Sequence, residues 1–266
     1  MHAAWNLMAK RYSGNYSIIY LSFVVGWFLG LPWAIMNLSQ QTDWATVGPI
    51  ILLTGLCHSV YGYVLNLTYR HGDISTLYPL LRGSGVALAV TAAVLAFGET
   101  LGRIAATGMV LAFAGVALVS YRRDRNTTRL RGIGLALLCG ALIGSYTVLD
   151  KLAVQHVHPI VLLNATQIIS GLVFLPYVLR NRRDELIHTV TVLWRPVAMI
   201  SVVALISYAI ILHVFTYAPL SRVTVAREVS VAFGAIGGHL IFKESFSKSR
   251  LIGVLLVLIG IILIRW

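Results

Sequence analysis

Two stretches decide the fold expected for this chain: FGETLGRIAATGMVLAFAG at residues 97–115 and FKESFSKSRLIGVLLVLIG at residues 242–260. A constant shift of 145 positions aligns them, and over residues 82–121 it yields ten identities without a gap. Leucine and valine matches arise by chance in apolar segments, whereas polar and glycine matches at one offset indicate duplication. Those matches are Arg82 with Arg227, Glu99 with Glu244, Gly108 with Gly253 and Gly115 with Gly260.

The composition places these repeats in a membrane. Apolar residues make up 58% of the chain, charged residues 11%, and the mean hydropathy is +0.82. A soluble domain carries about 25% charged residues, so this chain has too few to cover a water-exposed surface. The net charge of +12 would suggest nucleic acid in a soluble protein. Here the basic residues cluster between apolar runs, as the positive-inside rule describes, so the expected partner is a lipid bilayer and not nucleic acid.

The apolar runs predict an all-α integral membrane protein with about ten transmembrane helices. A crossing helix needs roughly 20 apolar residues, and nine runs meet that length while one is short. The predicted helices cover residues 1–11, 16–37, 45–69, 74–97, 103–121, 131–151, 159–179, 196–218, 220–242 and 249–265.

The helices divide into two predicted five-helix repeats, residues 1–123 and 131–266, joined by a basic loop at 124–130. Five is an odd number, so the second repeat would enter the membrane from the opposite side, which is the inverted arrangement of many secondary transporters. Most basic loop residues follow the odd-numbered helices. The positive-inside rule therefore places these loops in the cytoplasm and both termini outside.

The first predicted helix is short. Only nine residues precede Lys10, whereas the matching Lys151 ends a predicted helix of about twenty residues. We expect that the first helix is truncated at its N-terminus, either because the chain is a fragment or because its start site is placed too late.

Several of these features together resemble the drug/metabolite transporter superfamily, in particular its ten-helix EamA-type members. They are HAAWNLMAKR at residues 2–11, the FGE and FKE motifs, the trailing glycine pairs and the matched arginines. The resemblance implies a central cavity lined by helices 1, 3, 4, 6, 8 and 9, with helices 2 and 7 peripheral and helices 5 and 10 at the base. It implies no particular substrate, because the family carries amino acids, sugar derivatives, nucleotides, drugs and phosphorylated sugars.

Two arginines lie at membrane depth. Arg82 is about eight residues into the predicted helix 74–97, and Arg227 about seven into 220–242, which puts each roughly 10–12 Å deep. A guanidinium at that depth is expected to face a partner or a watery cavity. The pair could be symmetric cationic clamps for a carboxylate or phosphate. Alternatively, each could form a structural ion pair or extend to the headgroups.

Glu228 is the acid expected at membrane depth. It could take up protons and couple transport to a proton gradient. The slightly favoured alternative is that it balances the charge of Arg82 or Arg227.

Other polar and aromatic residues are candidates for the cavity wall. His58 and Tyr61 share a helical stripe, and Tyr78 lies one turn before Arg82, next to the helix-loosening Pro79. Ordinary packing and interhelical hydrogen bonding are equally compatible with these positions. The predicted substrate-binding residues are Arg82, Arg227, His58, Tyr61, Tyr78, Trp5, Asn6 and Tyr146.

The remaining features have structural interpretations. Glu99 and Glu244 are expected to cap the helices that follow them. Lys10 and Lys151 are expected to be interfacial anchors, with a gating role as the alternative. The small residues Gly108, Gly115, Gly253 and Gly260, together with Ala112, are expected to let helices pack closely.

These features predict a secondary active transporter of a small anionic or zwitterionic metabolite, working by alternating access and driven by protons or a counter-substrate. The alternative is a flippase-like transporter of a lipid-linked or phosphorylated headgroup. An integral membrane enzyme is less favoured, because H-E-x-x-H and G-x-S-x-G motifs and an intramembrane acid pair are absent from the sequence. We therefore predict no enzymatic activity, no cofactor, no metal, and a multi-pass location in a bacterial inner membrane.

Overall fold

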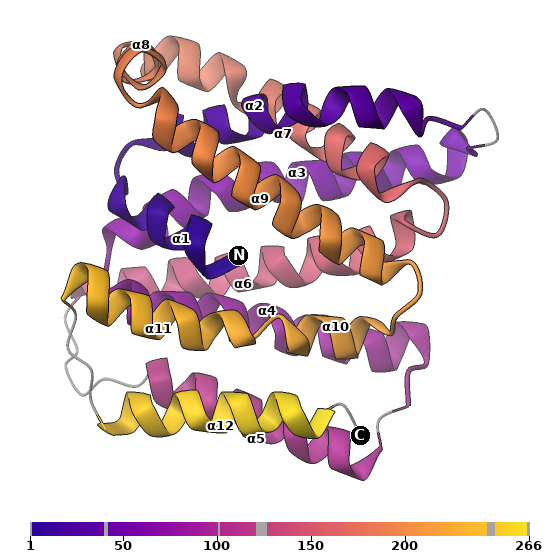
Figure 1. Cartoon of the computed structure of the whole chain (residues 1–266), viewed down its shortest axis with the longest axis vertical. Coiled ribbons are helices and arrows are strands. Elements are labelled where there is room, and N and C mark those ends of the chain that lie inside the picture. Colours follow the sequence, from indigo (N-terminus) through magenta and orange to yellow (C-terminus); the bar gives the residue numbers. More distant parts are fainter. Residues whose placement is uncertain (1, 40–41, 101, 121–126, 244–247, 265–266) are drawn as a thin grey trace. The chain divides into compact units, whose positions relative to one another are not determined.

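The computed structural model describes residues 2–39, 42–100, 102–120, 127–243 and 248–264, and every regular element in these ranges is a helix (Figure 1). The elements are α1 (His2–Arg11), α2 (Tyr16–Met36), α3 (Trp44–Arg70), α4 (Ile74–Phe97), α5 (Arg103–Ser120), α6 (Thr127–Ala153), α7 (Pro159–Asn181), α8 (Arg183–Val192), α9 (Trp194–Phe215), α10 (Leu220–Ala226), α11 (Val229–Phe242) and α12 (Lys248–Ile264).

Seven helical spans in the described ranges are long and apolar enough to cross a membrane. They are Tyr16–Met36, Trp44–Arg70, Ile74–Phe97, Leu130–Ala153, Pro159–Asn181, Trp194–Phe215 and Leu220–Phe242, and two shorter apolar helices cover Arg103–Leu118 and Leu251–Leu263. In its described residues the chain thus has only helices as regular elements, with several apolar spans, which is the pattern of a multi-pass integral membrane protein that its composition predicted.

Two details differ from the helices predicted from the sequence. The polar stretch 180–195, expected to be a connection, contains the additional helix α8. The helix predicted over 220–242 is interrupted between Ala226 and Val229, where α10 ends and α11 begins.

Helix α8 forms because its first turn has specific partners. The Glu185 carboxylate accepts hydrogen bonds from the backbone N–H and the hydroxyl of Ser17, both at 2.9 Å, at the start of α2. Arg182 donates to Glu185 at 3.0 Å and to the Tyr177 hydroxyl at 3.3 Å. The bond to Tyr177 is the main cause that raises the pKa of Arg182 above its ordinary value. A polar stretch is thus held as a helix by local contacts of Arg182 and by the contact of Glu185 with Ser17, which is distant in sequence.

The chain forms two compact units. Unit 1 comprises residues 1–66 and 145–217, and unit 2 comprises residues 67–144 and 218–266. Each unit takes helices from both halves of the sequence, so the division by packing differs from the division by repeat at 124–130.

In unit 1, α2 packs against α7 and α9, and α1 packs against α9. Glycines bring these helices close to large neighbours. A β-carbon at Gly55 of α3 would lie 2.6 Å from Ile169 of α7, and one at Gly62 would lie 2.7 Å from the Phe23 ring of α2. Small residues are the usual means by which membrane helices approach one another.

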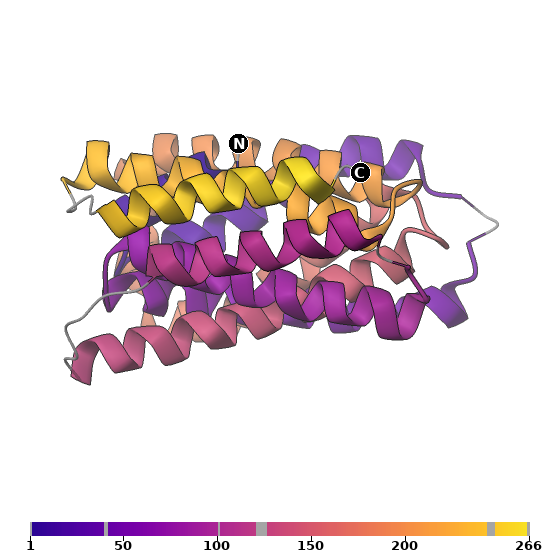
Figure 2. The same cartoon turned by 90° about the horizontal axis from the view of Figure 1, so that it is seen from below.

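In unit 2, α5 and α12 lie side by side along their length (Figures 1 and 2). A β-carbon at Gly115 would lie 2.5 Å from the carbonyl oxygen of Gly253, and one at Gly260 would lie 2.4 Å from that of Gly108. The backbones are therefore in direct contact. The prediction that these repeated glycines serve helix packing is confirmed.

Replacing Gly115 with alanine is expected to lower the free energy of unfolding by about 1–3 kcal/mol, because the new methyl group has no space beside the α12 backbone. Thermal unfolding of the purified protein in detergent measures the effect. Gly134→Ala in α6 is the matched control, since a β-carbon at that position meets nothing within 4 Å. Equal melting temperatures for the two variants would contradict the close contact of α5 and α12.

Two helices of unit 2 end in the left-handed conformation at positions related by the shift of 145. Gly98 ends α4 with φ 64°, and Lys243 ends α11 with φ 55°. Glycine adopts this conformation without steric cost, whereas a residue with a β-carbon is strained there by roughly 1–2 kcal/mol. Position 243 thus has the same left-handed backbone conformation as position 98, but it carries lysine and not the glycine that suits this conformation.

Lys243→Gly is therefore expected to stabilise the protein by about 1 kcal/mol, and Gly98→Ala to destabilise it by a similar amount. Thermal unfolding of both single variants tests this pair of opposite effects. A lower melting temperature for Lys243→Gly would show that the lysine side chain contributes more than its backbone strain costs.

Candidate functional site

Unit 2 contains a buried ion pair between α4 and the junction of α10 with α11. Arg82 Nη2 lies 2.9 Å from Glu228 Oε1, and the two side chains are only 5% and 2% exposed. Removing either charge from water is costly, and the attraction of the partner offsets this cost only while both are present. Of the alternatives that the sequence left open for Arg82 and Glu228, the structure shows the ion pair.

The carboxylate of this pair lies at the break in a membrane-spanning segment. Around the break, Glu228 N–H donates to Val225 O at 2.9 Å and Val231 N–H donates to Glu228 O at 2.8 Å. Such i to i−3 bonds tighten the backbone and interrupt the regular α-helical pattern. Interrupted helices with a charged group beside them form the binding sites of many transporters.

Tyr78 contacts α11 just after this break. Its hydroxyl donates to Ser230 Oγ at 2.9 Å, and Gly234 makes room for its ring, since a β-carbon there would lie 2.5 Å from the ring. Tyr78 is one turn before Arg82 on α4, so the two side chains approach α11 together. The sequence-predicted neighbours Tyr78, Arg82 and Glu228 are therefore brought together in one place.

Arg227 has a different environment from Arg82. It is half-buried at the break, and its charge interacts electrostatically with both Glu228 and Tyr78. In one of the two interpretations of the sequence the arginines were symmetric clamps, whereas within unit 2 Arg82 is buried in an ion pair with Glu228 and Arg227 is the half-buried residue next to Glu228 in sequence. The symmetry of the sequence repeat therefore does not extend to the environments of the two side chains.

Glu99 caps a helix, but not the one expected. Its carboxylate accepts hydrogen bonds from the N–H groups of Leu220 at 2.6 Å and Ser221 at 3.1 Å, and from the Ser221 hydroxyl. These groups begin α10, whereas the sequence placed the cap on the helix that follows Glu99. The left-handed turn at Gly98 directs the carboxylate towards α10. Its repeat partner Glu244 lies outside the described residues.

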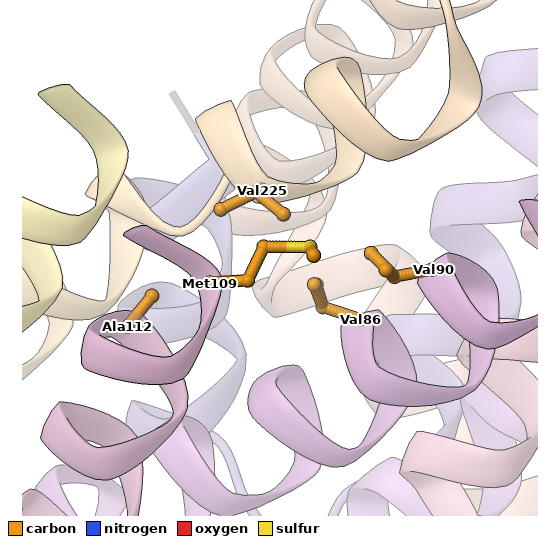
Figure 3. Packing of buried hydrophobic residues seen from close by; sticks show 5 residues of the cluster. All are labelled: Val86, Val90, Met109, Ala112 and Val225. Atoms are coloured by element: carbon orange, nitrogen blue, oxygen red, sulfur yellow. The ribbon is translucent and has the colours of Figure 1, made fainter. Parts of the chain in front are cut away.

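A cavity of about 440 Å³ lies beside this cap, lined by Glu99, Ser221, Arg222 and Met109 among others. Next to this cavity, the side chain of Met109 on α5 packs with residues of α4 and α10 in a hydrophobic cluster (Figure 3). The cluster consists of Val86, Val90, Met109, Ala112 and Val225. It holds α10 against α4 and so supports the segment that leads to Arg227.

Glu99→Ala is expected to lower the free energy of unfolding by about 1–2 kcal/mol, because two backbone donors of α10 lose their acceptor. Glu99→Gln keeps one acceptor oxygen and is expected to lose less. Thermal unfolding of the two variants gives the order. A fully stable Glu99→Ala variant would show that water replaces the carboxylate without loss.

Unit 1 contains a second buried acid, Asp150 of α6, whose exposure is 0%. Thr54 Oγ1 donates to Oδ1 at 2.6 Å, the Tyr208 hydroxyl donates to Oδ2, and His58 Nε2 lies 3.9 Å from Oδ2. Asp150 was not among the residues predicted from the sequence, because it precedes Lys151 near a predicted helix end. Its position one helical turn after Tyr146 was the available signal.

Aromatic rings surround this group. The His58 ring stacks on Tyr146 with centroids 4.0 Å apart, and the Tyr61 and Tyr208 rings meet Tyr146 edge-on at 5.7 and 6.1 Å. The predicted residues His58, Tyr61 and Tyr146 therefore form one cluster in unit 1, next to an acid that was not predicted from the sequence.

The other predicted residues of unit 1 lie elsewhere. Trp5 packs in a hydrophobic cluster with Ile18 of α2 and Val197 of α9, and Asn6 donates to His2 O at 2.8 Å within α1. Lys151, expected to be an interfacial anchor, donates from Nζ to Phe215 O at 2.6 Å, at the C-terminal end of α9. A cation is stabilised at that end of a helix by the carbonyl groups.

The comparison with known families settles what kind of protein carries these two sites. A model of the EamA-like transporter family matches residues 130–266, just over half of the chain. The chain belongs to the EamA-like transporter family. This family is part of the drug/metabolite transporter superfamily, as the sequence motifs suggested.

Two further similarities agree with this assignment. The chain is 26% identical over 194 residues to a WAT1-related chloroplast protein of Arabidopsis thaliana, a match that covers 66% of this chain and 46% of that protein. It thus spans about half the length of the relative. One solved crystal structure has the same fold as this EamA family chain, with a TM-score of 0.67 and a sequence identity of 12%. The match covers 98% of this chain and 94% of the chain in that structure.

Proposed function

We propose that this EamA family protein is a secondary active transporter that moves a small anionic or zwitterionic metabolite by alternating access. The observation that carries the proposal is the buried pair of Arg82 with Glu228 at the break between α10 and α11. An intramembrane charge is costly to retain and is characteristic of a transport pathway. The proposed setting is a bacterial inner membrane, with ten helices arranged as two inverted repeats, residues 1–123 and 131–266.

In this proposal Arg82 is the residue that binds the substrate anion, and Glu228 is its partner when no substrate is bound. A substrate carboxylate or phosphate displaces the Glu228 carboxylate from Arg82, because guanidinium groups bind both anions through the same donors. The displaced carboxylate is buried, so it takes up a proton, and this exchange couples substrate binding to protonation. Arg227 adds positive charge, and Tyr78 supplies a hydroxyl next to the pair.

The test is a thermal-stability screen of the purified protein against anionic, zwitterionic and cationic metabolites. A ligand at 100 times its Kd stabilises the folded state by about 2.7 kcal/mol. We expect an anionic or zwitterionic compound to raise the melting temperature of the wild type, and Glu228→Gln to bind it more tightly because Arg82 no longer has a competing carboxylate.

Arg82→Ala leaves Glu228 buried without its partner, which is destabilising in itself. The informative variant is therefore the double change Arg82→Gln with Glu228→Gln, which removes both charges and is expected to abolish the response to the anion. Arg222→Ala, an exposed arginine on the same segment, is the control and should respond like the wild type. A response to cations alone, or an unchanged response in the double variant, would disprove the anion site.

The same screen distinguishes the proposed transporter of a free metabolite from the flippase-like alternative. If the protein is stabilised only in nanodiscs that contain an anionic or phosphorylated lipid, and not by soluble anions, the substrate is a headgroup and not a free metabolite.

A further inference from the structure

We propose that His58 and Asp150 form a proton-binding site inside unit 1, separate from the ion pair of unit 2. The two side chains come from α3 and α6, and both are buried, with exposures of 8% and 0%. Whether this pair can hold a proton depends on which atoms of the imidazole and the carboxylate carry hydrogen.

One imidazole nitrogen is fixed as a donor. His58 Nδ1 lies 2.9 Å from the backbone carbonyl oxygen of Thr54. A carbonyl oxygen can only accept, so the hydrogen of this bond belongs to Nδ1. The neutral imidazole then has its lone pair on Nε2, the nitrogen on the side of Asp150.

The second nitrogen faces the carboxylate, with Nε2 3.9 Å from Asp150 Oδ2. Without a further proton, a lone pair and a negative charge would face each other at a site from which water is largely excluded. One added proton removes this repulsion, whether it binds to Nε2 as an imidazolium or to Asp150 as a carboxylic acid. The pair therefore has a binding place for one proton.

The same site also stabilises the form that has lost this proton. Thr54 Oγ1 donates to Asp150 Oδ1 at 2.6 Å, and the Tyr208 hydroxyl donates to Oδ2. Two hydroxyl donors stabilise a bare carboxylate, which would otherwise be costly at zero exposure. A site in which both protonation states have partners can load and release a proton.

Other ionisable groups near Asp150 come from α3, α6 and α9. Cys57 of α3 lies within reach of its charge, and Tyr61 lies one turn after Cys57. On α6, Tyr146 stacks on His58, while Lys151 donates to Phe215 O. On α9, Tyr208 donates to the carboxylate. Among these groups, His58 is the one base whose ordinary pKa lies near neutral pH.

The role of this site rests on the proposed function, since a proton taken up here would accompany the substrate through the transport cycle. It differs from Glu228, whose proton is exchanged for an anion on Arg82. The protein would thus have one proton site in each unit.

The experiment follows the imidazole signals of histidine-labelled protein by NMR over pH, in phosphatidylcholine nanodiscs without any metabolite. The His58 signal is identified by its absence in His58→Gln. Asp150→Asn is expected to move the titration midpoint of His58 to lower pH by roughly one to three units, because the imidazolium loses its counter-charge. Tyr208→Phe is expected to move it to higher pH, because the carboxylate loses a donor and attracts the proton more strongly.

Asp43→Asn, an exposed acid at the start of α3, is the control and should leave the His58 midpoint unchanged. Unchanged signals from the other histidines show that a variant is folded, and Tyr208→Phe tests the site if Asp150→Asn does not fold. The same His58 midpoint in wild type, Asp150→Asn and Tyr208→Phe would overturn the proposal. A shift of the His58 signal on replacing choline chloride with sodium chloride at constant pH would instead identify a sodium site. Because no metabolite is used, failure here is distinct from failure of the anion screen on Arg82.

Discussion

A charge removed from water must find its partner within the protein, and this constraint governs both sites of the molecule. The bilayer offers no hydrogen-bonding groups at depth, so a buried carboxylate or guanidinium is tolerated only where other side chains satisfy it. Glu228 is satisfied by Arg82, and Asp150 by two hydroxyl donors. Each acid thereby ties together helices that are distant in sequence.

The helices can meet at these acids because glycines allow close packing. In unit 2 the backbones of α5 and α12 touch at Gly115 and Gly260, and Gly234 of α11 admits the ring of Tyr78. In unit 1, Gly55 and Gly62 place α3 against α7 and α2. The apolar surfaces provide little driving force for association in lipid, so close packing and the buried polar contacts together specify the arrangement within each unit.

The candidate sites could be predicted only in part, for reasons that particular residues make plain. Arg82, Glu228 and Tyr78 were selected because a charge in a long apolar run is conspicuous, and Tyr78 precedes Arg82 by one turn. Asp150 was overlooked because its neighbour Lys151 made the segment resemble a helix end. Glu99 was assigned to the adjacent helix, whereas the turn at Gly98 directs it to α10. The break at Glu228 could not be predicted, because no proline or glycine lies between Ala226 and Val229.

The sequence by itself determined the all-helical membrane class, nearly all of the helix ranges and the transporter family, because these depend on local composition, on the length of apolar runs and on motifs at fixed spacing. Only the tertiary structure decided that Arg82 pairs with Glu228, that Asp150 gathers His58, Thr54 and Tyr208, and that each compact unit draws on both halves of the chain. The physical reason is that hydrogen bonds and ion pairs act over a few ångströms, whereas residues that meet at such distances can be far apart along the chain, as Arg82 and Glu228 are at a separation of 146 positions.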